Sequence, residues 1–355
     1  MPEGESHRRG GGYACGTTAE NRHGADRPGP RGDRRLNRPG PPAGSTAPMH
    51  TTTPPPTEPP APAFTAAERD LTRRQLTVFA LVLPALVLPS LAYAVSQGLD
   101  LNRLDQAPVS AQIAVFSGGF MPGVAGLAGW LAAGRGLRGF DWGLRRVRWP
   151  VIGLAWLIPV LGVIPAYVVA WLTGAARFDP GNLATSTGLP PVLGVLLGLV
   201  PGIVPYMLLS YGEQIGWSNL LAVRLSATRS VDATALIVGL AWGVSHFPLM
   251  LLVPGGIEEG VPAPYALLWF MVETVALAYP LVWLRLRTGS IWPVLVLHAT
   301  LNASVYFVAG AMTAATDHSG WFVGEGGALT SVFIALAVLG TRPLWRNVTA
   351  SSAAN

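Results

Sequence analysis

Residues 75–97 read QLTVFALVLPALVLPSLAYAVSQ and contain no aspartate, glutamate, lysine, arginine or histidine. Two later stretches share this property: residues 109–133, VSAQIAVFSGGFMPGVAGLAGWLAA, and residues 150–173, PVIGLAWLIPVLGVIPAYVVAWLT. A helix of about 20 mostly apolar residues crosses the hydrocarbon core of a bilayer. Proline and glycine occur often in such helices and do not exclude them. The three stretches therefore predict membrane-spanning helices.

Five further apolar stretches continue the pattern, at 191–222, 232–253, 264–284, 290–311 and 326–341. The first of them carries Pro201 and Pro205, where we expect a kink, and the last is the shortest. Half of all residues are hydrophobic and 12% are charged, against about 25% in soluble domains. The predicted fold class is an all-α polytopic membrane protein with about eight transmembrane helices.

The first 64 residues have a different composition from the rest of the chain. They hold 13 of the 32 prolines, 10 of the 42 glycines and 8 of the 24 basic residues. Such a segment cannot bury enough apolar surface to fold. We expect a disordered tail over 1–68, a membrane domain over 69–346 and a short tail over 347–355. Translation from Met49 stays open beside Met1. Cys15 is the single cysteine, which excludes a disulfide framework.

The arginines outside the tail predict the orientation in the membrane. The chain has no lysine, and its arginines sit in short loops between apolar runs rather than in a nucleic-acid-binding patch, so no nucleic-acid partner is expected despite a net charge of +5. Eight spans would place 14 arginines on one side and two, Arg103 and Arg177, on the other. Positive charge marks the cytoplasmic side, so both termini should be cytoplasmic. The 14 are Arg69, Arg73, Arg74, Arg135, Arg138, Arg145, Arg146, Arg148, Arg224, Arg229, Arg285, Arg287, Arg342 and Arg346.

Apart from Asp232, the first residue of the stretch 232–253, four charged or imidazole side chains fall inside the predicted spans: Glu213, His246, Glu273 and His298. Such groups are costly in a bilayer, face the bundle interior and mark functional sites. At 1.5 Å per residue, Glu213, His246 and His298 lie about 18, 22 and 12 Å from the cytoplasmic ends of their helices. One carboxylate and two imidazoles are therefore expected to meet in one cavity that opens to the cytoplasm. For Glu273, a structural role, a proton relay and a substrate contact all stay open.

The spacing of neighbouring residues adds detail. His298 and Asn302 are four residues apart, as are Trp242 and His246, so each pair shares a helix face. Gly212 and Gly216 flank Glu213 as a pair of small residues, which lets another helix approach closely.

Three motifs resemble those of the CPBP family, also called the CAAX prenyl protease or abortive-infection family, whose members are multi-helix intramembrane peptidases. YGEQIGWSNL at 211–220 is similar to the first motif, usually Glu-Glu-xxx-Arg. WGVSHFP at 242–248 is similar to the second, aromatic-xxx-His, and HATLN at 298–302 to the third, His-xxx-Asn. The resemblance covers about residues 135–310, including the loop at 136–146, and implies a peptidase core at about 190–310.

The resemblance assigns roles to these residues. It implies that Glu213 is the general base, that His246 holds the same water, and that His298 and Asn302 stabilise the oxyanion. Gln214, Trp217, Ser218 and Trp242 would support the site. Two positions depart from the family pattern, because Gln214 replaces the second glutamate and Ser218 replaces the arginine. The expected general base, Glu213, is retained, and two of the side chains expected to support it are changed.

The expected activity is hydrolysis of a membrane-associated protein or peptide, including a prenylated CAAX-type substrate, without a cofactor. Zinc held by Glu213, His246 and His298 is a competing mechanism. A catalytically silent scaffold or bacteriocin-immunity-type family member, and a proton-coupled transporter, are competing functions. We expect a multi-pass protein of a bacterial plasma membrane, with the lipid bilayer as its surroundings.

Overall fold

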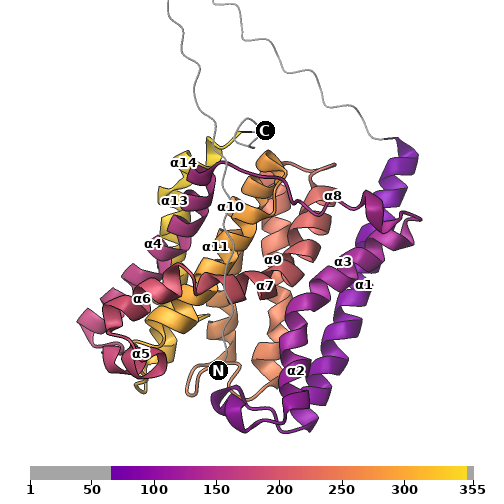
Figure 1. Ribbon diagram of the computed structural model, residues 1–355. Coiled ribbons are helices and arrows are strands. Elements are labelled where there is room, and N and C mark those ends of the chain that lie inside the picture. The colour runs from indigo at the N-terminus through magenta and orange to yellow at the C-terminus, as the bar shows by residue number, and fades with distance from the viewer. Residues whose placement is uncertain (1–64, 350–355) are drawn as a thin grey trace, which may run out of the picture. The chain divides into compact units, whose positions relative to one another are not determined.

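The computed structural model describes residues 65–349 (Figure 1). The predicted tail up to residue 64, and residues 350–355, lie outside this range. The first half of the chain forms α1 (Ala66–Ser96), η1 (Leu101–Gln106), α2 (Val109–Ser117), η2 (Gly118–Phe120), α3 (Met121–Ala132), η3 (Leu137–Gly139), α4 (Trp149–Thr173), β1 (Arg177–Phe178), α5 (Pro180–Thr187) and α6 (Pro191–Leu199). The second half forms α7 (Ile203–Gln214), η4 (Ile215–Ala222), α8 (Val223–Leu225), α9 (Val231–Leu252), α10 (Ala263–Thr288), α11 (Trp292–Asn302), η5 (Ala303–Ala309), β2 (Thr313–Ala314), α12 (Ser319–Phe322), α13 (Ala328–Gly340) and α14 (Arg342–Arg346).

The all-α membrane fold is confirmed. Within residues 65–349, seven helical segments are long and apolar enough to cross a membrane, and they coincide with the first seven predicted stretches. The eighth stretch forms α13, which has 13 residues and rises only about 20 Å, less than the roughly 30 Å hydrocarbon core. It is short because the chain before it runs as a loop with the small helix α12. The paired strands β1 and β2 have two residues each.

The first helix begins slightly earlier than predicted. α1 starts at Ala66, inside the segment expected to be a tail up to residue 68. The Thr65 hydroxyl accepts a hydrogen bond from the Glu68 backbone N–H, and the Glu68 carboxylate accepts one from the Thr65 N–H. This reciprocal pair satisfies two N–H groups that a helix start leaves open.

The fourth span is broken, which confirms the expected kink. α6 ends at Leu199 and α7 begins at Ile203, with Val200 between them in a non-helical conformation. Pro201 lacks the N–H that a continuous helix would use. The end of this span changes again, because residues 215–222 form a π-helix, and a second π-helix covers residues 303–309. We call these two segments the wide turns. They directly follow Gln214 and Asn302, and π-helical turns are often found at functional sites.

Glycines hold α7 and η4 tightly against α3, as the small-residue pair predicted. A Cβ added at Gly212 would lie 2.5 Å from the Gly119 carbonyl oxygen, and one at Gly123 would lie 2.5 Å from the Gly212 carbonyl oxygen. A Cβ at Gly216 would overlap the backbone of Pro122. We call this contact the glycine seam. The seam fixes the backbone on both sides of Glu213 against η2 and α3, and neither segment carries a charged side chain.

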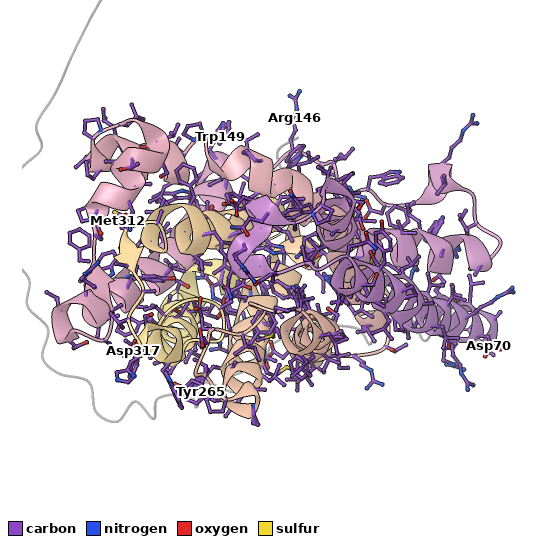
Figure 2. All side chains as sticks on the ribbon, turned by 90° about the horizontal axis from the view of Figure 1, so that it is seen from below. Asp70, Arg146, Trp149, Tyr265, Met312 and Asp317 are labelled. Carbon is purple, nitrogen blue, oxygen red and sulfur yellow. The ribbon has the colours of Figure 1, made fainter. Side chains whose placement is uncertain are left out.

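The arginine-bearing helix ends lie on one side of the bundle, at the top of Figure 1. Arg135, just past α3, and Arg224 of α8 both lie 5.0 Å from the ring centre of Trp130. Arg287 of α10 and Arg346 of α14 likewise share the ring of Trp283. In the view along the helices (Figure 2), Asp70 of α1 and Met312, just before β2, mark opposite ends of the section. These arginines therefore gather at one end of the bundle, and its orientation in the membrane stays a prediction.

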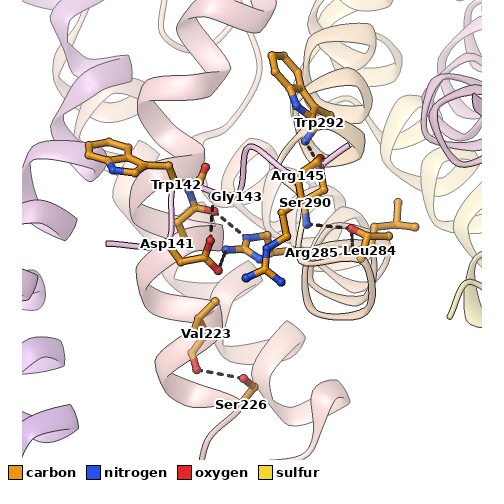
Figure 3. A network of polar contacts seen from close by, with 12 residues as sticks. Asp141, Trp142, Gly143, Arg145, Val223, Ser226, Leu284, Arg285, Ser290 and Trp292 are labelled. Carbon is orange, nitrogen blue, oxygen red and sulfur yellow. Dashed lines mark hydrogen bonds and ion pairs between the residues drawn. The ribbon is translucent and has the colours of Figure 1, made fainter. Parts of the chain in front are cut away.

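A buried arginine joins three segments at this side (Figure 3). Arg285 of α10 is 2% exposed, and its Nε donates to Asn219 Oδ1 at 2.7 Å. Its terminal nitrogen donates to Asp141 Oδ2 at 2.9 Å. Asn219 also donates to the Trp142 carbonyl at 3.0 Å. This Arg285 clamp fixes the loop between α3 and α4 to α10 and to the first wide turn.

Replacing Arg285 with methionine is expected to lower the melting midpoint of the detergent-solubilised protein by roughly 5 °C, about 2 kcal/mol. The change leaves Asn219 Oδ1 without its donor and Asp141 without its cation. Desolvation raises the pKa of Asp141, but the hydrogen bond and charge of Arg285 outweigh it, so the net pKa is lowered. The stabilisation is therefore present at neutral pH and is lost as the pH falls through that lowered pKa.

The control is Arg103→Met, which removes an exposed pair with Asp100 and should change the midpoint little. Equal melting midpoints for Arg285→Met and wild type would contradict a structural role for the clamp.

Candidate active site

Glu213 lies at the end of α7, next to the first wide turn. Its Oε2 accepts a hydrogen bond of 3.1 Å from the indole Nε1 of Trp242, a buried residue of α9. The glycine seam holds the backbone of Glu213 from the other side. The carboxylate is half-buried, and one of its oxygens is oriented by a neutral donor rather than by a cation.

His246 follows Trp242 by one helical turn on α9. Its Nδ1 lies 3.0 Å from the Trp242 carbonyl oxygen and 3.3 Å from the Ser245 hydroxyl. Because a carbonyl oxygen only accepts, Nδ1 carries the proton in the neutral ring. The Nε2 of His246 is then free to accept a hydrogen bond.

His298 of α11 has the opposite arrangement. The Gln214 side-chain amide donates to His298 Nδ1 at 3.1 Å, and the Ser218 hydroxyl donates to Gln214 Oε1 at 2.6 Å. All three side chains are buried. With Nδ1 accepting, the neutral ring carries its proton on Nε2 and is a donor. The two positions that depart from the family pattern therefore form one hydrogen-bonded chain that orients His298.

The structure brings the predicted carboxylate and imidazoles together around Trp242. The Trp242 ring lies 5.0 Å from the ring of His298 and 6.4 Å from that of His246. The same indole donates its N–H to Glu213. Three helices thus contribute one acceptor imidazole, one donor imidazole and one carboxylate to the same place.

Two predicted site residues have other surroundings. Asn302 lies one turn beyond His298 and is half-buried, and among residues 65–349 its side chain has no hydrogen-bond partner. Trp217 is 1% exposed and packs edge-on against Phe79 of α1 at 5.4 Å, with its indole N–H unpaired. Trp217 is therefore a core residue between η4 and α1. It was grouped with the site because it falls within the first motif.

A small cavity reaches the site from the side of α1 and α2. Its volume is about 120 Å³, which is room for several water molecules. Glu213, Ser245 and His246 supply polar groups to it, and the walls from α1, α2 and α3 are mostly apolar. It can hold water beside Glu213 and His246.

Sequence reasoning missed one residue of the site, Ser245. Its hydroxyl lies 3.3 Å from His246 Nδ1, and the residue lines the cavity with Glu213 and His246. The signal that could have found it is its place inside the second motif, directly before His246.

The fold and site together define a multi-pass membrane protein with a carboxylate and two oppositely oriented imidazoles on adjacent helices. Residues 187–304 match the family described as type II CAAX prenyl endopeptidase Rce1-like. The matched segment contains Glu213, His246, His298 and Asn302, and the match confirms the resemblance drawn from the three motifs. Among curated proteins, no relative matches the chain.

Proposed function

We propose that this protein is an intramembrane endopeptidase that cleaves membrane-associated substrates with a water molecule activated by Glu213. The observation that carries the proposal is the pair of opposite histidine tautomers beside one carboxylate. Peptide hydrolysis needs a base for water, a donor for the developing oxyanion and a proton for the leaving amine. Glu213 would supply the base and His298 the donor. The proton that Glu213 takes from the water would then pass to the leaving amine.

The proposed reaction uses the geometry in a fixed order. Water bonded to Glu213 and to the free Nε2 of His246 loses a proton to the Glu213 carboxylate as its oxygen attacks the peptide carbonyl carbon. The carbonyl oxygen becomes negative and accepts from the Nε2–H of His298. The C–N bond then breaks, and the proton passes from Glu213 to the leaving nitrogen. Asn302, one turn from His298, is proposed as a second oxyanion donor once substrate is present.

The orientation of His298 also bears on the zinc alternative. A neutral imidazole binds a metal through an unprotonated nitrogen, and here the unprotonated Nδ1 of His298 accepts from Gln214. The remaining Nε2 carries a proton, which suits an oxyanion donor. We therefore favour a reaction without a cofactor.

Apolar walls around the cavity support a substrate that approaches within the membrane. The test incubates the full-length protein in liposomes with a peptide library in prenylated and unprenylated form, and products are identified by mass spectrometry. Cleavage by wild type, and none by Glu213→Ala, is expected. If only the prenylated peptides are cleaved, the substrate is of the CAAX type. If both forms are cleaved, the substrate range is wider. No cleavage of any peptide by well-folded wild type would favour the silent scaffold.

We also propose that the protein lies in the plasma membrane with both termini in the cytoplasm, because its arginine-bearing helix ends gather on one side. Reporter fusions in the loops at 98–108, 254–263 and 312–325 are expected to read as external, and a fusion after Arg346 as cytoplasmic. A cytoplasmic readout from either of the last two loops would contradict the model of the topology. Fusions that preserve the melting midpoint serve as the folding control.

A further inference from the structure

Two arginines share one tryptophan ring at the arginine-bearing end of the bundle, near α8 in Figure 1. The guanidinium carbons of Arg135 and Arg224 each lie 5.0 Å from the ring centre of Trp130. Arg135 is exposed, in the loop that follows α3, and Arg224 is half-buried, in α8. We call Arg135 and Arg224 the Trp130 arginines. The ring brings together two charges that the sequence keeps far apart.

The Trp130 ring is held in place by its surroundings. It is 5% exposed, and its indole N–H donates to the Gly136 carbonyl at 3.0 Å. The ring of Phe140 contacts it edge-on, with 5.4 Å between the ring centres. Gly134 has φ +71°, a left-handed conformation that ends many helices at glycine, and it turns the chain so that Arg135 returns over the ring. The ring is therefore a fixed platform for both arginines.

No carboxylate balances the two positive charges. Among residues 65–349, the side chains of Arg135 and Arg224 form no ion pair and no hydrogen bond. The Nε of Arg224 is buried and has no hydrogen-bond partner in this part of the chain. Two like charges over one ring repel each other, and an indole face compensates a guanidinium charge only in part. The Trp130 arginines therefore carry charge that an external anion would balance.

A second tryptophan ring shows the same stacking with a carboxylate present. Arg287 and Arg346 lie 4.4 and 4.3 Å from the ring centre of Trp283. We call them the Trp283 arginines. Arg346 also forms an ion pair with Asp232, near the start of α9. The two pairs of arginines thus share their aromatic platform and differ in their charge balance, which makes the Trp283 arginines a matched control.

The depth of the Trp130 arginines places them at the level of lipid headgroups. The segments Val109–Ala132 and Pro191–Leu225 are long and apolar enough to cross a membrane, and Arg135 and Arg224 lie at their ends. Tryptophan is enriched where the hydrocarbon core meets the headgroups. The planar guanidinium group matches the oxygens of a phosphate, and basic pockets between spanning helices bind anionic headgroups.

We propose that the Trp130 arginines bind a phosphate group, supplied by the headgroup of an anionic phospholipid beside α3 and α8. Each guanidinium donates to the phosphate oxygens, and the exposed side chain of Arg135 turns to share the group with Arg224. The bound phosphate joins the loop after α3 to the segment that follows the first wide turn. Arg224 lies roughly three helical turns beyond Glu213, so this site is separate from the candidate active site and does not depend on the proposed function.

The first test measures lipid binding to the full-length protein in a non-ionic detergent by native mass spectrometry, with dioleoyl phosphatidylglycerol as the probe. Arg135→Gln combined with Arg224→Gln is expected to weaken binding about 30-fold, since each arginine near a membrane surface contributes about a factor of five. Arg135→Gln alone, at an exposed side chain, leaves the packing of α8 intact and should weaken binding about fivefold.

The control combines Arg287→Gln with Arg346→Gln, which removes the same formal charge from the same end of the bundle. Its lipid binding should stay close to that of wild type. Equal weakening in both double variants would mean that the lipid responds only to total charge, and it overturns the proposal. Wild-type binding by Arg135→Gln and by its combination with Arg224→Gln also overturns it.

The melting midpoint of the full-length protein distinguishes a lipid from a free phosphate, because a ligand of the folded state raises it. Phosphatidylglycerol is expected to raise the midpoint of wild type but not that of Arg135→Gln with Arg224→Gln. Phosphatidylcholine, whose choline balances the phosphate, and inorganic phosphate should both raise it less. A rise with inorganic phosphate alone would overturn the lipid as the source of the phosphate. No rise with any of the three in wild type overturns the site itself.

Discussion

Glu213→Gln is expected to lower kcat/KM for peptide hydrolysis by about 1,000-fold or more, the size of effect that a general base supplies. Glutamine matches glutamate in shape, and its side-chain oxygen can still accept from the Trp242 indole. It cannot take a proton from water, so the loss isolates the chemistry from the packing. The measurement is the initial rate of product formation from the best peptide of the library, at saturating and at low substrate concentration.

An intermediate variant and a folding control accompany this prediction. Trp242→Phe removes the indole donor to Glu213 and keeps the carboxylate, so its rate should fall between those of wild type and Glu213→Gln. The melting midpoints of wild type and Glu213→Gln should agree within a few degrees, because the carboxylate is half-buried and one neutral donor holds it. Glu213→Gln with activity within a few-fold of wild type would refute its role as the base.

His246→Ala is expected to lower the rate by about 100-fold or more, since it removes the acceptor that holds the attacking water. Its Nδ1 is occupied by the Trp242 carbonyl, so Nε2 is the ring nitrogen left to accept from water in the cavity that both residues line. The matched control is His318→Ala, which changes a histidine at the start of α12, outside the site. The measurement is the same cleavage assay, with folding followed by the melting midpoint.

Adding a metal chelator to the cleavage assay distinguishes the water mechanism from a zinc mechanism. We expect wild-type activity to survive chelation, and His246→Ala to stay inactive when zinc is added. Loss of wild-type activity on chelation, with recovery on added zinc, would contradict the reaction without a cofactor. Full activity of His246→Ala would remove His246 from the site altogether.

The spans and the three motifs could be predicted because each depends on short stretches of sequence. A run of 20 apolar residues needs no tertiary information, and a histidine inside such a run is conspicuous. The break at Pro201 and the close contact at Gly212 were also predictable, because they follow from the missing N–H of proline and the missing side chain of glycine.

The rest depends on contacts between distant parts of the chain. Gln214 and Ser218 look like a weakened motif in the sequence, whereas in the structure they orient a histidine 84 residues from Gln214. Arg285 was counted as one of the charges in the cytoplasmic loops, but its nitrogens pair with Asn219 and Asp141.

The wide turns can absorb the loss of a single residue. A π-helical turn holds one residue more than an α-helical turn, so a deletion within 215–222 is expected to return this segment to ordinary helix. The residues before and after the deletion then keep their relative direction. The same deletion within the α-helical residues of α7, which hold no extra residue, would rotate the two parts of the span by about 100° relative to each other. The chain would stay helical and apolar, so an inserted but misassembled protein is the expected product of a deletion in α7, and a deletion in the wide turn should be tolerated better.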